Sequence, residues 1–539
     1  MKKQKILLIV PFAVVILGMI GYILGEHYTI YAAFLASLKL LKVHLDPLPA
    51  GNITLELARW TGVLFFFSLI YTAVMALANR GIALIKSKKT DTVAVHGDSA
   101  YATLLARGLG RQGLLSDDRQ AYKAKTQVFL YQKDEDALIH YQKHADDFLP
   151  SQEVFLCMKK IRQEAVRDSS GANLNVVNLA EVKAVAYWQK HFCTKSEKIV
   201  MIGSGEQAVM MLYWGLLVNV FDVSNRITYY LIGDYTSYFN LHPEVKENMK
   251  TYGDDTVTEL PGNWTAHRGV LAEADRIILC DDAAPNVEIA SQILETIPGV
   301  PVHICVDSER MQQVLDVDRC TYFGFMTEDT VEEMILRQGL ERTARICAQS
   351  YVSREDLQDV DKMKEKTPEE IAAKIGTPEE EEHWKAMDAF TRGSNLACAV
   401  HSVQKSRLMK ELLERYGREY GGDSFWKDLL RKYDGDLDPE KMTVLEDADV
   451  FFNHFSPADQ ERLMEIEHIR WNRYHFLHNW HAPEPGEVLT DRDGRPVSKD
   501  PERRLHRCLV PFRDLPEEER IKDAAYYYTL PLRANPEEK

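Results

Sequence analysis

The chain has 539 residues, of which 65 are basic and 81 acidic, so its formal net charge is −16. Apolar residues make up 45% and aromatic residues 10%, which excludes a disordered or fibrous protein, and the length suits roughly three or four domains. An acidic chain lacks the basic surface of nucleic-acid-binding proteins, so we expect no nucleic-acid partner.

Two uncharged apolar runs near the N-terminus predict transmembrane helices. Residues 6–25 follow a lysine-rich start, and residues 60–79 lie between Arg59 and Arg80. Each run has about 20 residues, so as a helix it is roughly 30 Å long, the thickness of the hydrocarbon core. A cleaved signal peptide followed by a buried core helix is disfavoured, because the first run is too long and ends without an A-x-A site.

The lysines that flank these runs predict their orientation. Lysines occur in residues 2–5 and 86–89, and the positive-inside rule then places both termini in the cytoplasm. Lys39, Lys42 and Arg59 lie in the outer loop, against this rule. We expect a multi-pass protein of the inner cell membrane, with a two-span hairpin in residues 1–90 that contacts the lipid bilayer.

The loop between the two runs carries an apolar stripe at helical spacing, from Ile30 to Leu45, which ends before Pro47. Such a helix lies in the membrane interface or dips between the spans as a pore helix. A potassium filter needs a Thr-Val-Gly-Tyr-Gly-like run, which the sequence lacks. An interfacial helix is therefore favoured.

Two later stretches follow the strand–turn–helix–strand order of a doubly wound parallel sheet. The first has a strand at 92–98, a helix at 100–109 and a strand at 127–131. The second has a strand at 198–202, a glycine turn at 203–208, a helix at 209–221 and a strand at 227–232. It continues with a strand at 274–280, a helix at 287–294 and a strand at 301–306.

The second turn fits the pattern G-x-G-x-x-A. Its first glycine makes the turn, and its second lets a pyrophosphate approach backbone N–H groups at the helix start. Asp234 ends the next strand, although it lies farther along the chain than the ideal spacing of about 20 residues for a ribose ligand. A glycine turn retained for packing, with no ligand, remains the alternative.

The run ADRIILCDDAAPNVEIASQIL, followed by VPVHICV, resembles the TrkA-N or RCK domain. These Rossmann-type regulators of potassium channels and transporters bind NAD, ATP or related nucleotides. Residues 196–345 resemble a clear copy and residues 91–195 a degenerate one, in which Gly97-Asp98-Ser99 replaces the glycine pair. The resemblance implies a nucleotide site formed by Gly203, Ser204, Gly205, Glu206, Asp234, Asp281 and Asp282.

Residues 346–384 predict a charged helical linker, and helices are expected at 384–416 and 457–480. His475 and His478 lie one turn apart and could reach a metal, but no acidic or cysteine ligand has a matching spacing, so an aromatic core face is favoured and no metal is expected. Residues 490–495 predict a hairpin turn rather than a calcium loop.

The order of MEIEHIRWNRYHFLHNW and LHRCLVPFRDLPEEERIKDAAYYY resembles the RyR domain, the ryanodine receptor repeat, within residues 385–539. This module is expected to be mostly α-helical with a β-hairpin. Asn479, Arg507 and Phe512 depart from the family pattern. Aromatic faces beside cations suit a stacked base and its phosphates, with a core role as the alternative. The candidate ligand residues are His468, Arg470, Trp471, Arg473, Trp480 and His506.

Together these features predict a membrane-anchored nucleotide-sensing effector, acting as a homo-oligomer. Bacterial RyR modules joined to membrane spans imply a role in antiphage defence. The alternatives are an RCK-regulated cation channel or transport regulator that senses NAD(H) or ATP, and a membrane-tethered NAD-dependent enzyme. No Cys-His or Ser-His pairing points to catalysis, so we expect a binding protein without catalytic residues. The ligand is a small nucleotide: NAD(H), ATP or a signalling nucleotide.

Overall fold

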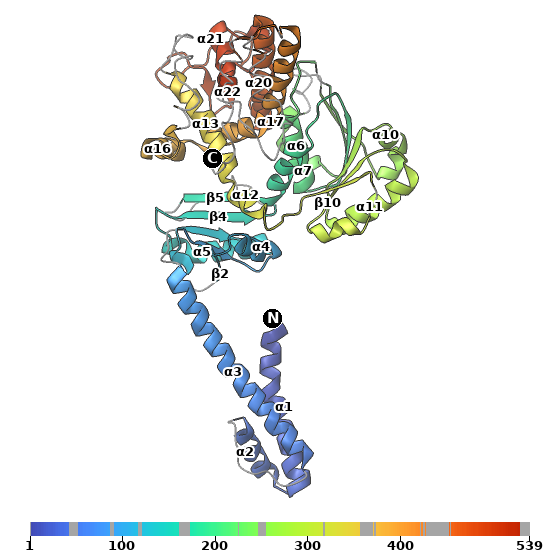
Figure 1. The fold of residues 1–539 in the computed structure, drawn as a ribbon, viewed down its shortest axis with the longest axis vertical. Helices are drawn as coiled ribbons and strands as arrows, with labels where there is room; N and C mark the ends of the chain where they lie inside the picture. The colour runs from blue at the N-terminus through green and yellow to red at the C-terminus, as the bar shows by residue number, and fades with distance from the viewer. Residues whose placement is uncertain are drawn as a thin grey trace. The chain divides into compact units, whose positions relative to one another are not determined.

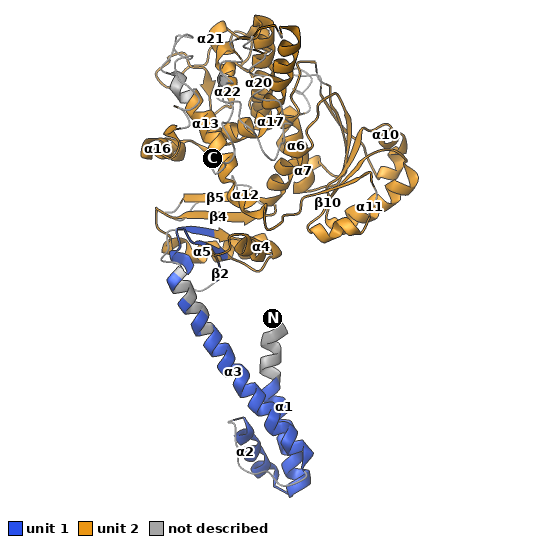
Figure 2. Cartoon of the chain, in the orientation of Figure 1, with its two compact units in different colours: residues 1–95, 114–127 blue, residues 96–113, 128–539 orange. Residues whose placement is uncertain are grey.

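The computed structural model describes most of the chain, which is drawn in Figure 1. The described residues are 2–41, 52–86, 91–116, 121–160, 173–224, 226–245, 255–315, 318–355, 370, 373–420, 422–423, 426, 452 and 454–528. The chain forms two compact units, residues 1–95 with 114–127 and residues 96–113 with 128–539 (Figure 2).

Three N-terminal helices pack closely through small residues: α1 (Lys2–Glu26), α2 (Ile30–Leu40) and α3 (Ile53–Lys86). A Cβ atom on Gly21 would lie 2.7 Å from the Leu55 side chain, and one on Gly62 would lie 2.3 Å from the Leu40 carbonyl oxygen. Asn52 Nδ2 donates a hydrogen bond to the Gly21 carbonyl at 3.0 Å. Glycine therefore permits the close approach of these helices.

Among the described residues, one helix is long and apolar enough to cross a membrane, Ile53–Met75 of α3. Its large apolar side chains are exposed, among them Trp60, Leu64 and Phe67. The described apolar part of α1, Val10–Glu26, is shorter. The structure thus supports one candidate span where the sequence predicts two. The helix predicted from Ile30 is α2, and its predicted end at Leu45 falls outside the described residues.

The first α/β sheet has the strand order β2-β1-β3-β4-β5. Its strands are β1 (Val93–His96), β2 (Gly113–Leu115), β3 (Thr126–Phe129), β4 (Glu153–Met158) and β5 (Asn173–Asn178). Its helices are α4 (Ala100–Gly108), α5 (Asp134–His144) and α6 (Leu179–Lys190). β4 and β5 pair in parallel, so that Asn178 at the carboxyl end of β5 lies opposite Met158.

The second sheet is parallel throughout, in the order β11-β10-β9-β6-β7-β8. Its strands are β6 (Lys198–Ile202), β7 (Thr228–Ile232), β8 (Thr256–Glu259), β9 (Arg276–Leu279), β10 (Val302–Cys305) and β11 (Cys320–Phe323). Its main helices are α7 (Glu206–Val218), α8 (Thr236–Leu241), α10 (Arg268–Ala272) and α11 (Ala283–Thr296). This is the strand order of dinucleotide-binding sheets, which confirms the predicted Rossmann-like parallel α/β class.

Alternating residues of the central strand face two separate cores. Ile199 and Met201 of β6 lie in a core with α6 and α7, whereas Val200 and Ile202 lie in a core with α10 and α11. Successive side chains of a strand point to opposite faces, so helices cover both faces of this sheet.

The C-terminal part is mostly helical, as predicted. Its longer helices are α12 (Val331–Leu336), α13 (Gln338–Glu355), α16 (Pro378–Ala386), α17 (Ala389–Glu419) and α20 (Pro457–Leu477). The shorter elements are β12 (Lys499–Asp500), β13 (Leu505–His506), α21 (Glu517–Arg520) and α22 (Ala525–Tyr528). β12 and β13 pair in antiparallel fashion, and Thr490 bridges Pro496, which places a hairpin turn where the sequence predicts one.

The helix predicted at 384–416 is two helices. Asp388 caps α17, because its Oδ1 accepts a hydrogen bond from the Thr391 N–H at 2.6 Å, and the chain is extended at Met387. The helix predicted at 457–480 ends at Leu477, and Asn479 adopts a left-handed backbone with φ 59°.

The helical part shares a core with the second sheet. Val400 and Val403 of α17 and Tyr474 and Leu477 of α20 belong to the same buried cluster as α7. Figure 1 shows α17 and α20 beside α6 and α7. A site between these helices is therefore held by a packed interior.

Candidate functional site

The glycine turn lies where the strand order of the second sheet reverses, between β6 and β9. Gly203 and Gly205 have φ values of 148° and 84°. Gly233, at the end of β7, is pressed against this turn, since a Cβ atom there would lie 1.9 Å from the Gly203 carbonyl oxygen. No atom lies within 4 Å of a Cβ built on Gly205, so the space beside it is open.

A carboxylate of the chain itself occupies part of this turn. Asp281 Oδ1 accepts a hydrogen bond from the Ser204 N–H at 3.0 Å. Glu206, the first residue of α7, accepts one from Asn178 Nδ2 at 3.0 Å. Ser204, Gly205, Glu206 and Asp281 are thus brought together, but Asp281 binds a backbone N–H of the kind that would hold a phosphate.

The other two predicted residues add negative charge to this edge of the sheet. Asp234 Oδ1 accepts a hydrogen bond from the Thr236 N–H of its own turn at 3.0 Å. That N–H group lowers the pKa of the Asp234 carboxyl. Asp282 precedes α11, is exposed and makes no capping hydrogen bond. The seven predicted residues hence include four acids and no cation, an unfavourable set for phosphate.

Arg470 of the C-terminal candidates lies in a buried ion-pair group. Its guanidinium binds Glu467 with nitrogen–oxygen distances of 2.7 to 3.1 Å, and Lys405 Nζ lies 2.7 Å from Glu467 Oε2. All three side chains are fully buried. Burial raises the pKa of Glu467, but Arg470 and Lys405 outweigh this and lower it to about 2.

His468 and Arg473 are also engaged within the interior. His468 Nδ1 lies 3.3 Å from Asp523 Oδ2, and its Nε2 binds the Val510 carbonyl at 2.8 Å. Arg473 Nη1 lies 2.8 Å from Asp255 Oδ2 and donates to the Leu216 carbonyl at 3.0 Å. His468 and Arg473 therefore link α20 to its surroundings, whereas Arg470 pairs with Glu467 of the same helix.

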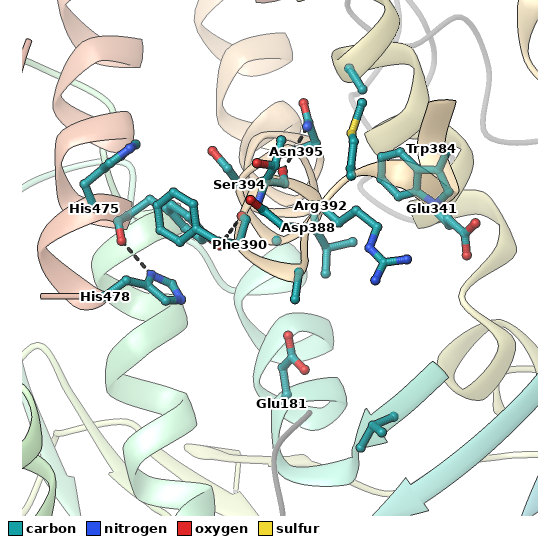
Figure 3. A pocket seen from close by; sticks show the side chains of 18 of the residues that line it. Glu181, Glu341, Trp384, Asp388, Phe390, Arg392, Ser394, Asn395, His475 and His478 are labelled. Atoms are coloured by element: carbon teal, nitrogen blue, oxygen red, sulfur yellow. Dashed lines mark hydrogen bonds between the residues drawn. The ribbon is translucent and has the colours of Figure 1, made fainter. Parts of the chain in front are cut away.

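The remaining candidates, Trp471, Trp480 and His506, line a cavity of about 760 Å³. Its walls come from β4, β5, α6, α7, α12, α13, α16, the loop before α17, the first turns of α17, α20, the β12–β13 hairpin and α22. Figure 3 shows some of the side chains that line it. Small-molecule sites typically have volumes of about 300–1,000 Å³. The cavity does not include the glycine turn.

One end of the cavity is aromatic. We call Phe390, Trp471, His475, Trp480 and His506 the aromatic cluster. Phe390 stacks on Trp480 with ring centres 5.1 Å apart and an angle of 24°, and Trp471 lies 3.9 Å from His475 and 4.9 Å from His506. Phe390, Trp471 and His506 are half-buried, so their faces are accessible from the cavity.

His475 and His506 are uncharged at neutral pH. Burial lowers the pKa of His475, and it lowers that of His506 to about 4. Nδ1 of His475 is bound to the Trp471 carbonyl at 2.9 Å, and Nδ1 of His478 to the Tyr474 carbonyl at 2.7 Å. These contacts place the possible metal pair within an aromatic wall.

The other end of the cavity is charged. Arg392 has no ion pair or side-chain hydrogen bond among the described residues, and Arg337 Nη2 is buried without a hydrogen-bond partner. We call these two residues the arginine pair. In Figure 3 the Arg392 guanidinium projects from α17 on the side facing Glu341 and Glu181, away from His475 and His478.

Sequence reasoning missed the residues that join the two ends, namely Phe390, Arg392, Arg337 and Trp384. All four precede the recognised RyR-like motif along the chain. The signal available was the run FTRGSNLACAVHSVQ, which combines an aromatic, a basic and several small residues at the start of α17. Arg337 has no sequence signal, since it enters the cavity through a left-handed turn with φ 53°.

No protein-family model matches the chain, and no curated protein sequence matches it. A solved structure that matches is the crystal structure of the GsuK bound to ADP. It has 12% sequence identity and a TM-score of 0.30, and the match covers 62% of this chain and 97% of that one. What the cavity binds therefore depends on the residues of this chain.

Proposed function

We propose that this chain is a membrane-anchored nucleotide receptor, in which a nucleotide binds the cytoplasmic part and the N-terminal helices respond as a two-span hairpin. Its proposed setting is the bacterial inner membrane, with both termini cytoplasmic and several copies assembled, as an effector of antiphage defence. The observation that carries the proposal is the cavity, which has an aromatic cluster at one end and two guanidinium groups with unused hydrogen-bond donors at the other.

The chemistry of the cavity matches the two parts of a nucleotide. Aromatic faces stack on a base, and each such contact contributes about 1–3 kcal/mol of binding free energy. Guanidinium groups bind phosphate through charge-assisted hydrogen bonds. The apolar, outward-facing surface of α3 supports the membrane anchor, and the lysines in residues 2–5 and 86–89 support the orientation. Binding drives a response only if the ligand favours one conformation over another.

The first test identifies the ligand. The full-length protein is purified in detergent and denatured, and the released small molecules are identified by mass spectrometry. We expect a compound with an aromatic base and an anionic group. If nothing of this class is released, and no nucleotide raises the melting temperature of the protein, the proposed function is wrong.

The second test locates the site. Trp471→Ala should weaken binding by about 1–3 kcal/mol through lost stacking, whereas Trp471→Phe keeps an aromatic face and should retain most of the affinity. Gly205→Ala, in the glycine turn, is the control for the other site and should leave this affinity unchanged. Equal affinities in wild type and Trp471→Ala would exclude the cavity.

A second candidate function is a regulatory subunit of a cation channel or transporter that senses NAD(H) or ATP at the glycine turn. It is supported by the dinucleotide-binding strand order and by the open space beside Gly205. Asp281 and the other acids of this edge oppose it. Loss of nucleotide affinity in Gly205→Ala, with Trp471→Ala unaffected, would favour this candidate.

A further inference from the structure

We propose that the cavity binds a nucleoside phosphate in one fixed direction, with the base at the aromatic cluster and the phosphate at the arginine pair. This inference rests on the proposed function and deepens it, because it assigns the ligand class and names the residues that select for the phosphate. Arg392 is the main selecting residue.

The acidic side chains that line the cavity have partners, whereas the arginine side chains keep unused hydrogen-bond donors. Each acidic side chain already has a partner: Glu341 binds Arg345 at 2.7 Å, Glu181 lies 3.7 Å from Arg337, and Asp388 accepts the capping hydrogen bond of α17. The cations have donors to spare, since Nη2 of Arg337 has no partner and the Arg392 side chain has none among the described residues. An anion would satisfy these donors.

The aromatic end offers no comparable anion site. The imidazoles of His475 and His506 are neutral, because burial lowers their pKa values. Two further cations border this end at the surface. Arg504 Nη1 donates to the His478 carbonyl at 2.9 Å, and Lys499 is exposed to solvent. A half-buried guanidinium binds phosphate more strongly than an exposed ammonium group, because water screens the latter.

The first turn of α17 separates the two ends. Phe390 and Arg392 are two positions apart on this helix, and side chains at that spacing do not face each other. Phe390 points toward His475 of α20 and His478 just after this helix, whereas Arg392 points toward Glu341 and Glu181 (Figure 3). A ligand that contacts both side chains must lie across the start of α17, which fixes its direction.

The test compares nucleotides with nucleosides on the full-length protein in detergent. Isothermal titration uses the four common ribonucleoside 5′-monophosphates and triphosphates and the corresponding nucleosides. Wild type should bind at least one nucleotide roughly 10- to 100-fold more tightly than its nucleoside. This is the gain in affinity expected from one or two charge-assisted hydrogen bonds to the phosphate. Arg392→Gln should remove this preference and leave the nucleoside affinity unchanged.

The matched control is Arg418→Gln, at an exposed position of the same helix, which should bind like wild type. If nucleotide and nucleoside bind wild type equally, or if Arg392→Gln weakens both to the same extent, the phosphate assignment is wrong while the proposed function stands. If neither class of compound binds wild type, and the denatured protein releases no compound with an aromatic base and an anionic group, the proposed function fails as well. The melting temperature of Arg392→Gln without ligand shows whether the variant folds.

Discussion

Glu467 is a fully buried carboxylate whose cationic neighbours outnumber it. Arg470 and Lys405 both bind it, and His401 adds no charge, because burial and Lys405 lower the pKa of that imidazole to about 3. Removing the single carboxylate would leave two cations in the interior without a counterion. Breaking a buried pair in this way is far more costly than breaking one at the surface.

Glu467→Gln should therefore lower the free energy of unfolding by about 3–5 kcal/mol. The control is Glu461→Gln on the same helix, since Glu461 is exposed and lies 3.6 Å from Arg520 Nη1. That variant should change stability by about 0–1 kcal/mol. Denaturant titration of both variants measures the difference, and equal losses would mean that the buried group does not depend on this carboxylate.

Buried neutral histidines predict an acid-sensitive fold. Burial lowers the pKa of His303 to about 3 and those of His191 and His506 to about 4, from an unfolded value of about 6.5. As pH falls below about 6.5, these histidines take up protons in the unfolded chain but not in the folded one. The free energy of unfolding is therefore highest above pH 6.5 and decreases as pH falls toward 4. His468, whose pKa Asp523 raises, acts in the opposite direction.

Melting temperatures measured between pH 7.5 and 4.5 should fall steadily below pH 6.5. Glu467 extends the loss at lower pH, because its pKa is lowered from about 4.5 to about 2. A melting temperature that stays constant from pH 7 to pH 5 would contradict the assignment of these imidazoles as neutral in the fold.

At the scale of elements, the turn between β6 and α7 depends on the glycine at the end of β7. Gly233→Ala would place a methyl group 1.9 Å from the Gly203 carbonyl oxygen, at a φ of 149° that side chains rarely adopt. The clash and the backbone strain together should lower stability by about 2–4 kcal/mol.

Gly262→Ala is the matched control for this substitution, because Gly262 has a positive φ of 86° but no atom within 4 Å of its Cβ position. It should cost only about 1–2 kcal/mol of strain. Unfolding midpoints of the two alanine variants separate clash from strain. Similar midpoints would show that the turn can move away from Gly233.

The elements that carry a local signal could be predicted from the sequence. The strand, glycine turn and helix at 198–218 follow from β-branched residues, two glycines and an apolar run, each a property of neighbouring residues. The break between α16 and α17 could not, since apolar residues continue through it and only the Asp388 cap marks it. The role of Arg473 depends on Asp255, which lies far from it in the sequence, so its motif did not reveal that role.

The cavity could not be predicted from the sequence either, because its lining residues are far apart in the chain. Its lining runs from Phe155 in β4 to Tyr526 in α22, so residues far apart in the chain meet only after both α/β sheets and the helical part have folded. Trp471 and Trp480 were identified because they are close together in one motif. Arg337 and Glu181 come from other elements, and no spacing relates them.

At the scale of the whole molecule, the proposed topology places the α1–α3 loop outside the cell. A cysteine at His27, an exposed position after α1, should react with a membrane-impermeant maleimide on intact cells. A cysteine at Asp91, exposed before β1, should react only after permeabilisation. Most native cysteines are buried, and Cys320, which is partly exposed, is first replaced by serine. Labelling of Asp91→Cys but not His27→Cys on intact cells would overturn this topology.

The Asp281 carboxylate on the Ser204 N–H behaves as a ligand tethered to its own receptor. A group held by a short link has an effective concentration in the millimolar range. A free metabolite at micromolar concentration must then bind the turn roughly a thousandfold more tightly than this carboxylate to replace it. Only an anion that is abundant, or that binds the turn unusually tightly, can therefore displace Asp281 from the Ser204 N–H.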